Sequence, residues 1–115
     1  MKTIKFKCKE YGETFYLAFE LSNYVSNNAL YVGIYNLVKE YNELDLFSDL
    51  SVNLDYDFKE NEIAVDVDNP EELIDLLVDM GIITFTGDVA YSGYNTYKIA
   101  TFNKDKAKDY IITNE

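Results

Sequence analysis

Hydrophobic and polar residues alternate along several segments of the chain, which is the pattern of half-buried β-strands. In the first of these, Ile4, Phe6 and Cys8 alternate with lysines, so we expect Cys8 to be buried on an apolar face. Between the patterned segments, 39–45 shows no clear period, and 87–93 is predicted to be a loop bounded by two glycines. Alternation, or a high content of β-branched and aromatic residues, predicts further strands over 14–22, 29–37, 50–58, 63–67 and 97–102.

One segment, 69–80, has the pattern of an amphipathic helix. Asn69 is a favourable N-cap, Pro70 suits the first helical position, and two glutamates follow at the positive end of the helix dipole. Leucines form much of a wide apolar face, and Gly81 is typical of the residue that ends a helix. We therefore predict a single α+β domain over 1–115, with a mostly antiparallel sheet of five to six strands. We expect the helix to pack on one face of this sheet and to leave the other face to solvent or a partner.

The composition excludes several kinds of chemistry. The chain has 115 residues, one cysteine, and no histidine, arginine or tryptophan. Without histidine it cannot form a Ser-His-Asp or Cys-His catalytic site, nor a metal site with histidine ligands. Its net charge of −11 disfavours nucleic acid and anionic membranes and favours basic protein surfaces. No segment approaches the ~20 apolar residues that span a bilayer, so we expect a cytoplasmic protein.

Acidic residues are concentrated in the middle of the chain. Fourteen acids lie between Glu40 and Asp79, with Lys59 as the only basic residue among them. Like charges this close repel one another, so the block is either a solubilising surface or a partner-binding one. In the second case, carboxylates stand where the phosphates of duplex DNA would stand against a basic groove. The partner-binding candidates, turned outward by strand alternation or helical spacing, are Asp55, Asp57, Glu62, Asp66, Asp68, Glu72, Asp75 and Asp79.

Tyrosine is the other abundant candidate for binding, with 11 copies in the chain. Tyr91 and Tyr94 flank a Ser-Gly pair and are the candidates for an interface. A tyrosine ring offers a large rigid contact area with a polar tip, although packing within a sheet accounts for such clusters as well. Stacking with single-stranded bases requires a positive groove, for which this acidic chain is unsuited.

Other combinations of residues give only weak indications of a metal site or a catalytic site. An EF-hand loop starting at Asp55 would need a glycine where Glu60 stands, which leaves only a non-standard cation site. Asp66 and Asp68 lie two apart on one strand face, where exposure provides no environment suited to acid–base catalysis. We therefore expect no catalytic residue, no metal and no cofactor.

Short motifs in the second half of the chain follow one another in a recognisable order. This order resembles a small domain-of-unknown-function family from phages and conjugative elements of Firmicutes and Bacteroidetes, which reads VNL, a D-x-N segment with a helix, TG and SG[FY]. The resemblance implies an accessory or anti-defence role and no agreed biochemical activity. The motifs are Val52-Asn53-Leu54, Ala64-Val65-Asp66-Val67-Asp68-Asn69, Thr86-Gly87, Ser92-Gly93-Tyr94 and a last strand that contains Tyr97.

These patterns lead to two hypotheses of function. The first is a non-enzymatic acidic interaction protein of a mobile element, which inhibits a nucleic-acid-binding host nuclease by mimicking DNA, as anti-CRISPR or anti-restriction proteins do. The second is a structural or dimerising accessory module, which associates through an open sheet face or a tyrosine-rich edge. An enzyme is the least favoured class, because only carboxylates, tyrosine or a bound metal would be available to it.

Overall fold

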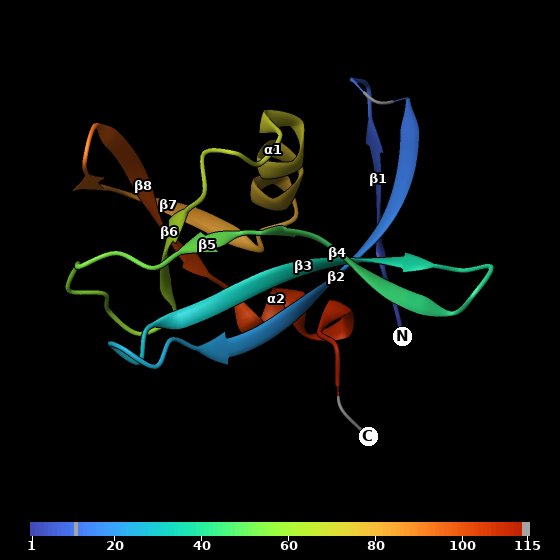
Figure 1. Cartoon of the computed structure of the whole chain (residues 1–115), viewed down its shortest axis with the longest axis horizontal. Helices are drawn as coiled ribbons and strands as arrows, with labels where there is room; N and C mark the ends of the chain where they lie inside the picture. Colours follow the sequence, from blue (N-terminus) through green and yellow to red (C-terminus); the bar gives the residue numbers. More distant parts are fainter. Residues whose placement is uncertain (11, 114–115) are drawn as a thin grey trace.

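Eight strands form two antiparallel sheets in the computed structural model, which describes residues 1–10 and 12–113 (Figure 1). The strand order is β1-β2-β3-β4 in the first sheet and β5-β6-β8-β7 in the second. The strands are β1 (Ile4–Cys8), β2 (Glu13–Asn23), β3 (Leu30–Val38), β4 (Glu43–Asp49), β5 (Ser51–Val52), β6 (Glu62–Val65), β7 (Ile83–Ser92) and β8 (Asn95–Phe102). The helices are α1 (Glu71–Asp79) and α2 (Lys104–Ala107), and α2 is followed by the 3₁₀ turn η1 (Lys108–Tyr110).

A single buried residue joins the two sheets. Leu50 lies between β4 and β5, and its N–H donates to the Val32 carbonyl of β3 at 2.9 Å. The Leu50 carbonyl accepts a hydrogen bond from the Asp66 N–H, just beyond β6, also at 2.9 Å. The chain therefore passes from one sheet to the other without a turn, and both sheets contribute to one core.

The main core is closed by α1, which contacts β1 and β7, one outer strand from each sheet (Figure 1). Leu73 and Leu77 are buried, and Leu76 and Met80 pack against the core while partly exposed. The alternation predicted for the first strand is confirmed, and Cys8 is buried as expected. The predicted helix is also confirmed, within two residues at its start and one at its end.

Asn69 is not the N-cap that its position in the sequence suggests. Pro70 occupies that position and makes no side-chain hydrogen bond. Asn69 is buried, and its Nδ2 donates to the carbonyls of Asp49 at 2.9 Å and of Asp66 at 3.2 Å. Its Oδ1 accepts from Ser48 Oγ at 2.6 Å. The side chain thus ties the start of α1 to the junction between the sheets.

The α+β class and the mostly antiparallel pairing are confirmed, but two four-stranded sheets replace the predicted single sheet of five to six strands. Residues 39–45, which lack a period, form a turn and the start of β4. The predicted loop over 87–93 is strand as far as Ser92, because β7 pairs with β8 along most of its length. Between Phe85 and Val89 the pairing register shifts, so a bulge interrupts β7.

The predicted strand over 50–58 leaves the sheet after β5. Beyond that point, Leu54 is buried on the outer face of the second sheet, against Ala64 and Ile99. Tyr56 and Phe58 pack beside it while partly exposed. The expectation that one sheet face is open is therefore wrong for the second sheet, because the loop over 53–61 covers part of it and makes a second, smaller core.

Candidate partner-binding surfaces

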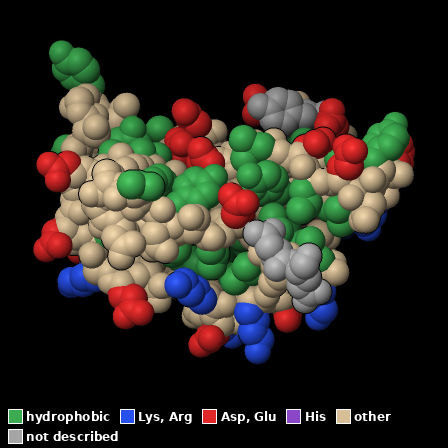
Figure 2. All heavy atoms as spheres, turned by 60° about the horizontal axis from the view of Figure 1, so that its bottom comes forward, with side chains coloured by type: hydrophobic (Ala, Val, Ile, Leu, Met, Phe, Trp, Pro, Cys, Tyr) green, Lys and Arg blue, Asp and Glu red, His purple; other side chains and the backbone are tan. Residues whose placement is uncertain are grey.

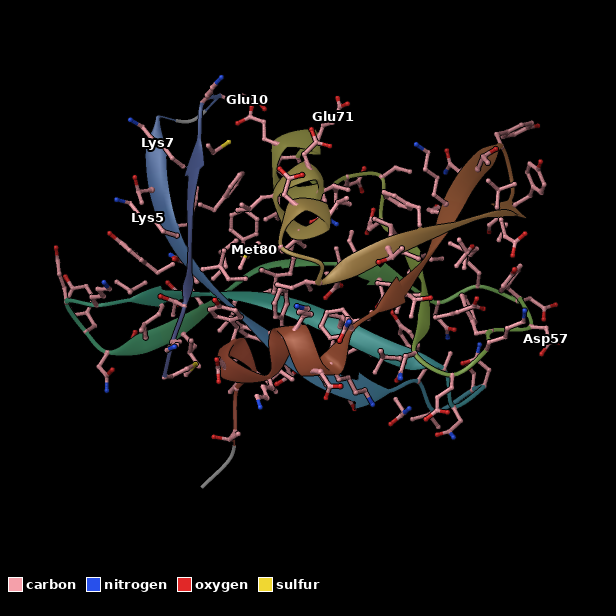
Figure 3. The ribbon with its side chains drawn as sticks, turned by 180° about the vertical axis from the view of Figure 1, so that it is seen from behind. Lys5, Lys7, Glu10, Asp57, Glu71 and Met80 are labelled. Atoms are coloured by element: carbon pink, nitrogen blue, oxygen red, sulfur yellow. The ribbon has the colours of Figure 1, made fainter. Side chains whose placement is uncertain are left out.

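α1 presents a row of carboxylates on its outer face. Burial of Leu73 and Leu77 turns the acids of the helix outward, and all of them are exposed. Glu72, Asp75 and Asp79 therefore share one exposed surface, as their helical spacing predicts, and Figure 3 shows Glu71 at the outer end of the same helix. We call Glu71, Glu72, Asp75 and Asp79 the α1 acids.

The α1 acids form no ion pair within the described part of the chain, and Glu72 Oε2 accepts a hydrogen bond from the Lys9 N–H at 3.5 Å. The one ion pair in that part of the chain joins Lys2 Nζ to Asp109 Oδ2 at 3.9 Å, between two exposed side chains. The last turn of α1 has no basic residue, so the helix itself contributes no lysine that would offset Asp79 at the negative end of the helix dipole. Lys5 and Lys7 point away from α1 on β1 (Figure 3). The helix surface is therefore electrostatically suited to an external basic group.

The loop that leads into α1 adds two further predicted residues. Asp68 is exposed, whereas Asp66 is partly buried. Asp66 Oδ1 accepts a hydrogen bond from the Asp68 N–H at 2.9 Å, which holds the loop in a turn. The structure therefore places Asp68 with the α1 acids as a carboxylate open to solvent, and gives Asp66 a partly structural role.

Asp55 and Asp57 belong to a separate acidic surface. Both are exposed on the loop over 53–61, and Asp57 lies at one end of the molecule, well separated from Glu71 (Figure 3). Side-chain hydrogen bonds hold this loop against the β2–β3 turn, since Asn27 Nδ2 donates to Asn53 Oδ1 at 3.0 Å. The continuous acid block of the sequence is thus divided between different sides of the fold.

Glu62 is buried, so its predicted outward position is wrong. Its Oε1 accepts a hydrogen bond from the Lys59 N–H at 2.9 Å, and its own N–H donates to the Lys59 carbonyl at 3.0 Å. These bonds close the turn before β6. Glu62 also acts on Tyr56, whose pKa is raised by partial burial and by the carboxylates of Asp88, Glu62 and Asp57.

The two tyrosine candidates lie at the tip of the β7–β8 hairpin. Tyr91 is 74% exposed near the end of β7, and Tyr94 is 107% exposed in the turn that follows. Tyr97 on β8 is instead partly buried and packs on the second, smaller core. The tip is therefore accessible, and β7 is one of the two outer strands of its sheet.

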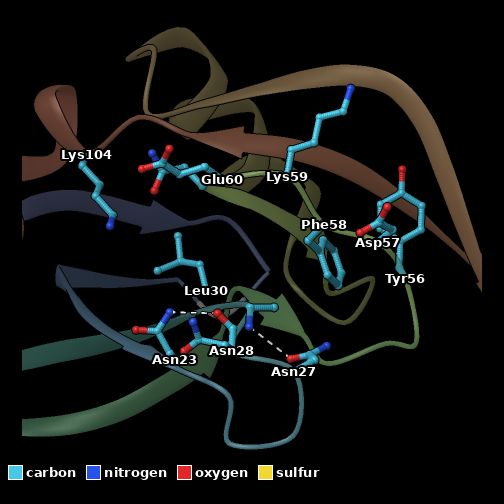
Figure 4. Close-up of a pocket in the computed structure, with 12 residues that line it drawn as sticks. Asn23, Asn27, Asn28, Leu30, Tyr56, Asp57, Phe58, Lys59, Glu60 and Lys104 are labelled. Atoms are coloured by element: carbon cyan, nitrogen blue, oxygen red, sulfur yellow. Dashed lines mark hydrogen bonds between the residues drawn. The ribbon is translucent and has the colours of Figure 1, made fainter.

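A polar hollow of about 560 Å³ lies between the β2–β3 turn and the loop over 53–61 (Figure 4). Lys104 and Leu30 contribute to its wall, together with three asparagines of the turn region. Several of the amides are already engaged, since Asn23 Nδ2 donates to the Asn28 carbonyl at 3.1 Å and Asn27 Oδ1 accepts from the Ala29 N–H, also at 3.1 Å. These contacts stabilise the turn.

Charged and apolar side chains are mixed over the face seen in Figure 2. Carboxylates are spread across this face, hydrophobic groups interrupt them, and lysines lie mostly along one side. Within residues 1–10 and 12–113, no three cysteine, aspartate or glutamate side chains are placed to hold one metal ion. In the same residues, no helix has the length and apolar character needed to cross a membrane.

Sequence periodicity does not reveal two features of these surfaces. The alternation of apolar and polar residues does not predict the asparagine contacts that fix the loop over 53–61. Each of these contacts joins residues that are distant in the sequence. The sequence predicts a loop before Tyr94, whereas the structure has the end of a strand pair there. The signal available for it is Ser92-Gly93, since Gly93 has a φ of 60°, which suits a tight hairpin turn.

The fold and these surfaces define an acidic α+β protein built mainly from antiparallel strands. A family model described as a domain of unknown function, DUF4313, matches residues 18–114, and the chain belongs to this family. The expectation of a domain-of-unknown-function family is thereby confirmed. Neither a comparison with curated proteins nor one with solved structures finds a match.

Proposed function

We propose that this chain is a non-enzymatic acidic module that binds a basic surface of another protein. The observation that carries the proposal is the set of α1 acids, which are exposed and form no ion pair in the described part of the chain. Clustered, uncompensated carboxylates favour association with lysine- and arginine-rich surfaces and accelerate it through electrostatic steering.

The finer form of the proposal is a DNA mimic of a mobile element that inhibits a host nuclease, as anti-CRISPR or anti-restriction proteins do. It is supported by the small size of the chain and by its charge of −11. A basic groove that holds DNA binds a row of phosphates, and the α1 acids offer an alternative row of negative charge.

The test is competition with DNA for a basic nuclease. A CRISPR effector and a restriction endonuclease are each bound to fluorescent duplex DNA, and the anisotropy is followed as the protein is added. We expect the protein to displace the DNA at low salt and to lose this ability as salt shortens the Debye length from ~10 Å at 0.1 M to ~3 Å at 1 M.

Two matched variants identify the surface responsible. The first is Glu72→Gln with Asp75→Asn and Asp79→Asn, on α1. The second is Glu40→Gln with Glu43→Gln and Asp45→Asn, three exposed acids at the β3–β4 hairpin. Both remove three charges, but we expect only the α1 variant to weaken competition, by about tenfold. Equal effects would show that net charge alone acts, and no competition by the parent protein with either nuclease would refute the finer proposal.

A second candidate function, a dimerising accessory module, is favoured by the exposed tip of the β7–β8 hairpin. Tyr91 and Tyr94 there offer aromatic area at the end of an outer strand. Sedimentation of the parent protein and of Tyr91→Ser with Tyr94→Ser tests it. A dimer that the paired substitution dissociates supports this function, and a parent protein that stays monomeric at high concentration contradicts it.

A further inference from the structure

A groove of about 280 Å³ opens beside α1, between the start of the helix and the second sheet. Its apolar lining comes from Val65, Val67, Ile74 and Phe85. Val67 is 58% exposed and Phe85 is 37% exposed, so two large apolar side chains of this lining face solvent. We call this hollow the α1–β8 groove.

The groove exists because α1 is shorter than the sheet that it covers. Alternation along β8 puts Thr96, Lys98, Ala100 and Phe102 on one face. Ala100 and Phe102 are fully buried in the main core, whereas Thr96 and Lys98 extend past the helix and line the groove. The sheet face that α1 covers therefore extends beyond the helix and is open to solvent there.

Lys98 lies in this open region, between two separate hollows. Its Nζ lies 5.4 Å from the centroid of the Phe85 ring, a cation–π contact. On the other side of Lys98 a second hollow of about 270 Å³ shares Phe85 and Lys98 with the groove and adds Val89, which is 40% exposed. The two hollows thus form a discontinuous apolar track along β7 and β8.

The charges around the track are mainly negative. Asp66 and Glu71 line the groove, and Asp88 lines the second hollow. Lys98 is the one base among the residues that line either of them. Exposed Asp68 lies in the same loop as Asp66, so an apolar side chain held in the groove would lie near several carboxylates of the segment 66–71.

We propose that the α1–β8 groove holds an apolar side chain from a lysine- or arginine-rich segment of a partner protein. The inference rests on the proposed function and gives it a specific chemistry, an apolar anchor flanked by basic residues. Charge complementarity selects this occupant over a second copy of the chain, which would bring its own charge of −11 to the same acidic rim.

The probes are two synthetic peptides of equal charge, acetyl-KRKLKRK-amide and acetyl-KRKSKRK-amide. They are titrated into ¹⁵N-labelled protein at low salt, and affinity and binding position are read from amide shifts. We expect the leucine peptide to bind about tenfold more tightly than the serine peptide, because leucine buries apolar area in the groove. The largest shifts should fall at Val67, Glu71 and Phe85.

Three variants of exposed residues test the site. Val67→Ser should reduce the preference for the leucine peptide severalfold, whereas Val25→Ser should not, because Val25 is fully exposed on the β2–β3 turn. Lys98→Ala should strengthen binding of both peptides by about twofold, since it removes a like charge from the groove. If Lys98 had only a structural role, its replacement by alanine would not strengthen peptide binding.

The outcomes separate this inference from the function on which it rests. If both peptides bind equally and Val67→Ser has no effect, charge alone drives binding; the proposed function then stands and the groove inference is overturned. If neither peptide binds at low salt, both fail. A leucine preference that Val67→Ser removes, with shifts confined to the groove, supports the inference.

Discussion

The side chain of Tyr31 is held in place by a single hydrogen bond, and its ionisation links that bond to pH. Its hydroxyl donates to Asp49 Oδ1 at 2.7 Å. Partial burial, and then the bond and charge of Asp49, raise the pKa of Tyr31 above that of an unfolded tyrosine. A raised pKa in the folded state means that this stabilisation is complete below about pH 10 and is lost as the pH rises further.

We therefore predict two effects of Tyr31→Phe. At pH 7 the free energy of unfolding should fall by about 1 kcal/mol, because the hydrogen bond to the exposed carboxylate of Asp49 is lost. Between pH 9 and pH 11 the variant should lose less stability than the parent, as measured by urea unfolding. Tyr94→Phe, at a fully exposed position, is the control and should change neither quantity. An unchanged pH profile for Tyr31→Phe would contradict the assignment.

Gly33 makes room for the same tyrosine. A Cβ atom at this position would lie 2.5 Å from the Tyr31 hydroxyl oxygen and 3.1 Å from Cζ. Gly33→Ala should therefore displace Tyr31 from Asp49 and destabilise the protein by about 1–3 kcal/mol. In a Tyr31→Ala background the same substitution should have a much smaller effect, because the clash is absent. Additive effects in urea unfolding would show that the two residues do not interact.

At the scale of elements, α1 is the part of the fold on which both core and acidic surface depend. Leu77 is buried at the centre of its inner face, so Leu77→Ala should reduce the free energy of unfolding by roughly 2–4 kcal/mol. Val78→Ala, on the adjacent and more exposed surface, is the matched control and should have a clearly smaller effect. A loss below about 0.5 kcal/mol for Leu77→Ala, measured by urea unfolding, would mean that this surface is not core.

Elements with a local signal could be predicted from the sequence, and those fixed by distant contacts could not. Strand alternation and helical spacing locate β1 and α1 closely, because the side-chain period reports which face is buried. The division into two sheets depends on Leu50, whose hydrogen bonds reach Val32 and Asp66 far along the chain. Leu50 also alternates normally with its neighbours, so nothing local marks it as the junction.

The same distinction applies to the surfaces. The exposure of Glu72, Asp75 and Asp79 follows from the helical period alone. Alternation predicts that Glu62 points outward, which is wrong because its carboxylate closes a turn, a role that alternation does not encode. The α1–β8 groove could not be predicted, since it depends on where α1 ends relative to a sheet whose strands come from elsewhere in the chain.

At the scale of the whole molecule, a large charge acts within a fold that spans 41 × 34 × 23 Å. A net charge of −11 makes the compact state repel itself. The described residues contain one ion pair, Lys2 with Asp109, and both of its side chains are exposed. Salt therefore screens much repulsion and little attraction, so its electrostatic effect on this protein is stabilising.

We predict that the melting temperature rises as NaCl increases from 0.02 M to 0.5 M, because the Debye length then falls from tens of Å to a few Å. Most of the rise should occur below about 0.2 M, where screening changes fastest, whereas exclusion of salt from the protein surface acts mainly at higher concentration.

The variant with Glu72→Gln, Asp75→Asn and Asp79→Asn should melt higher than the parent at 0.02 M and show a smaller rise with salt, since it starts with less repulsion. Lys2→Gln with Lys5→Gln and Lys7→Gln should behave in the opposite way, because it makes the net charge more negative. If the melting temperature falls with salt, or if the two triple variants shift the salt response in the same direction, the acids of this protein are stabilised by contacts within the fold and are not available to a basic partner.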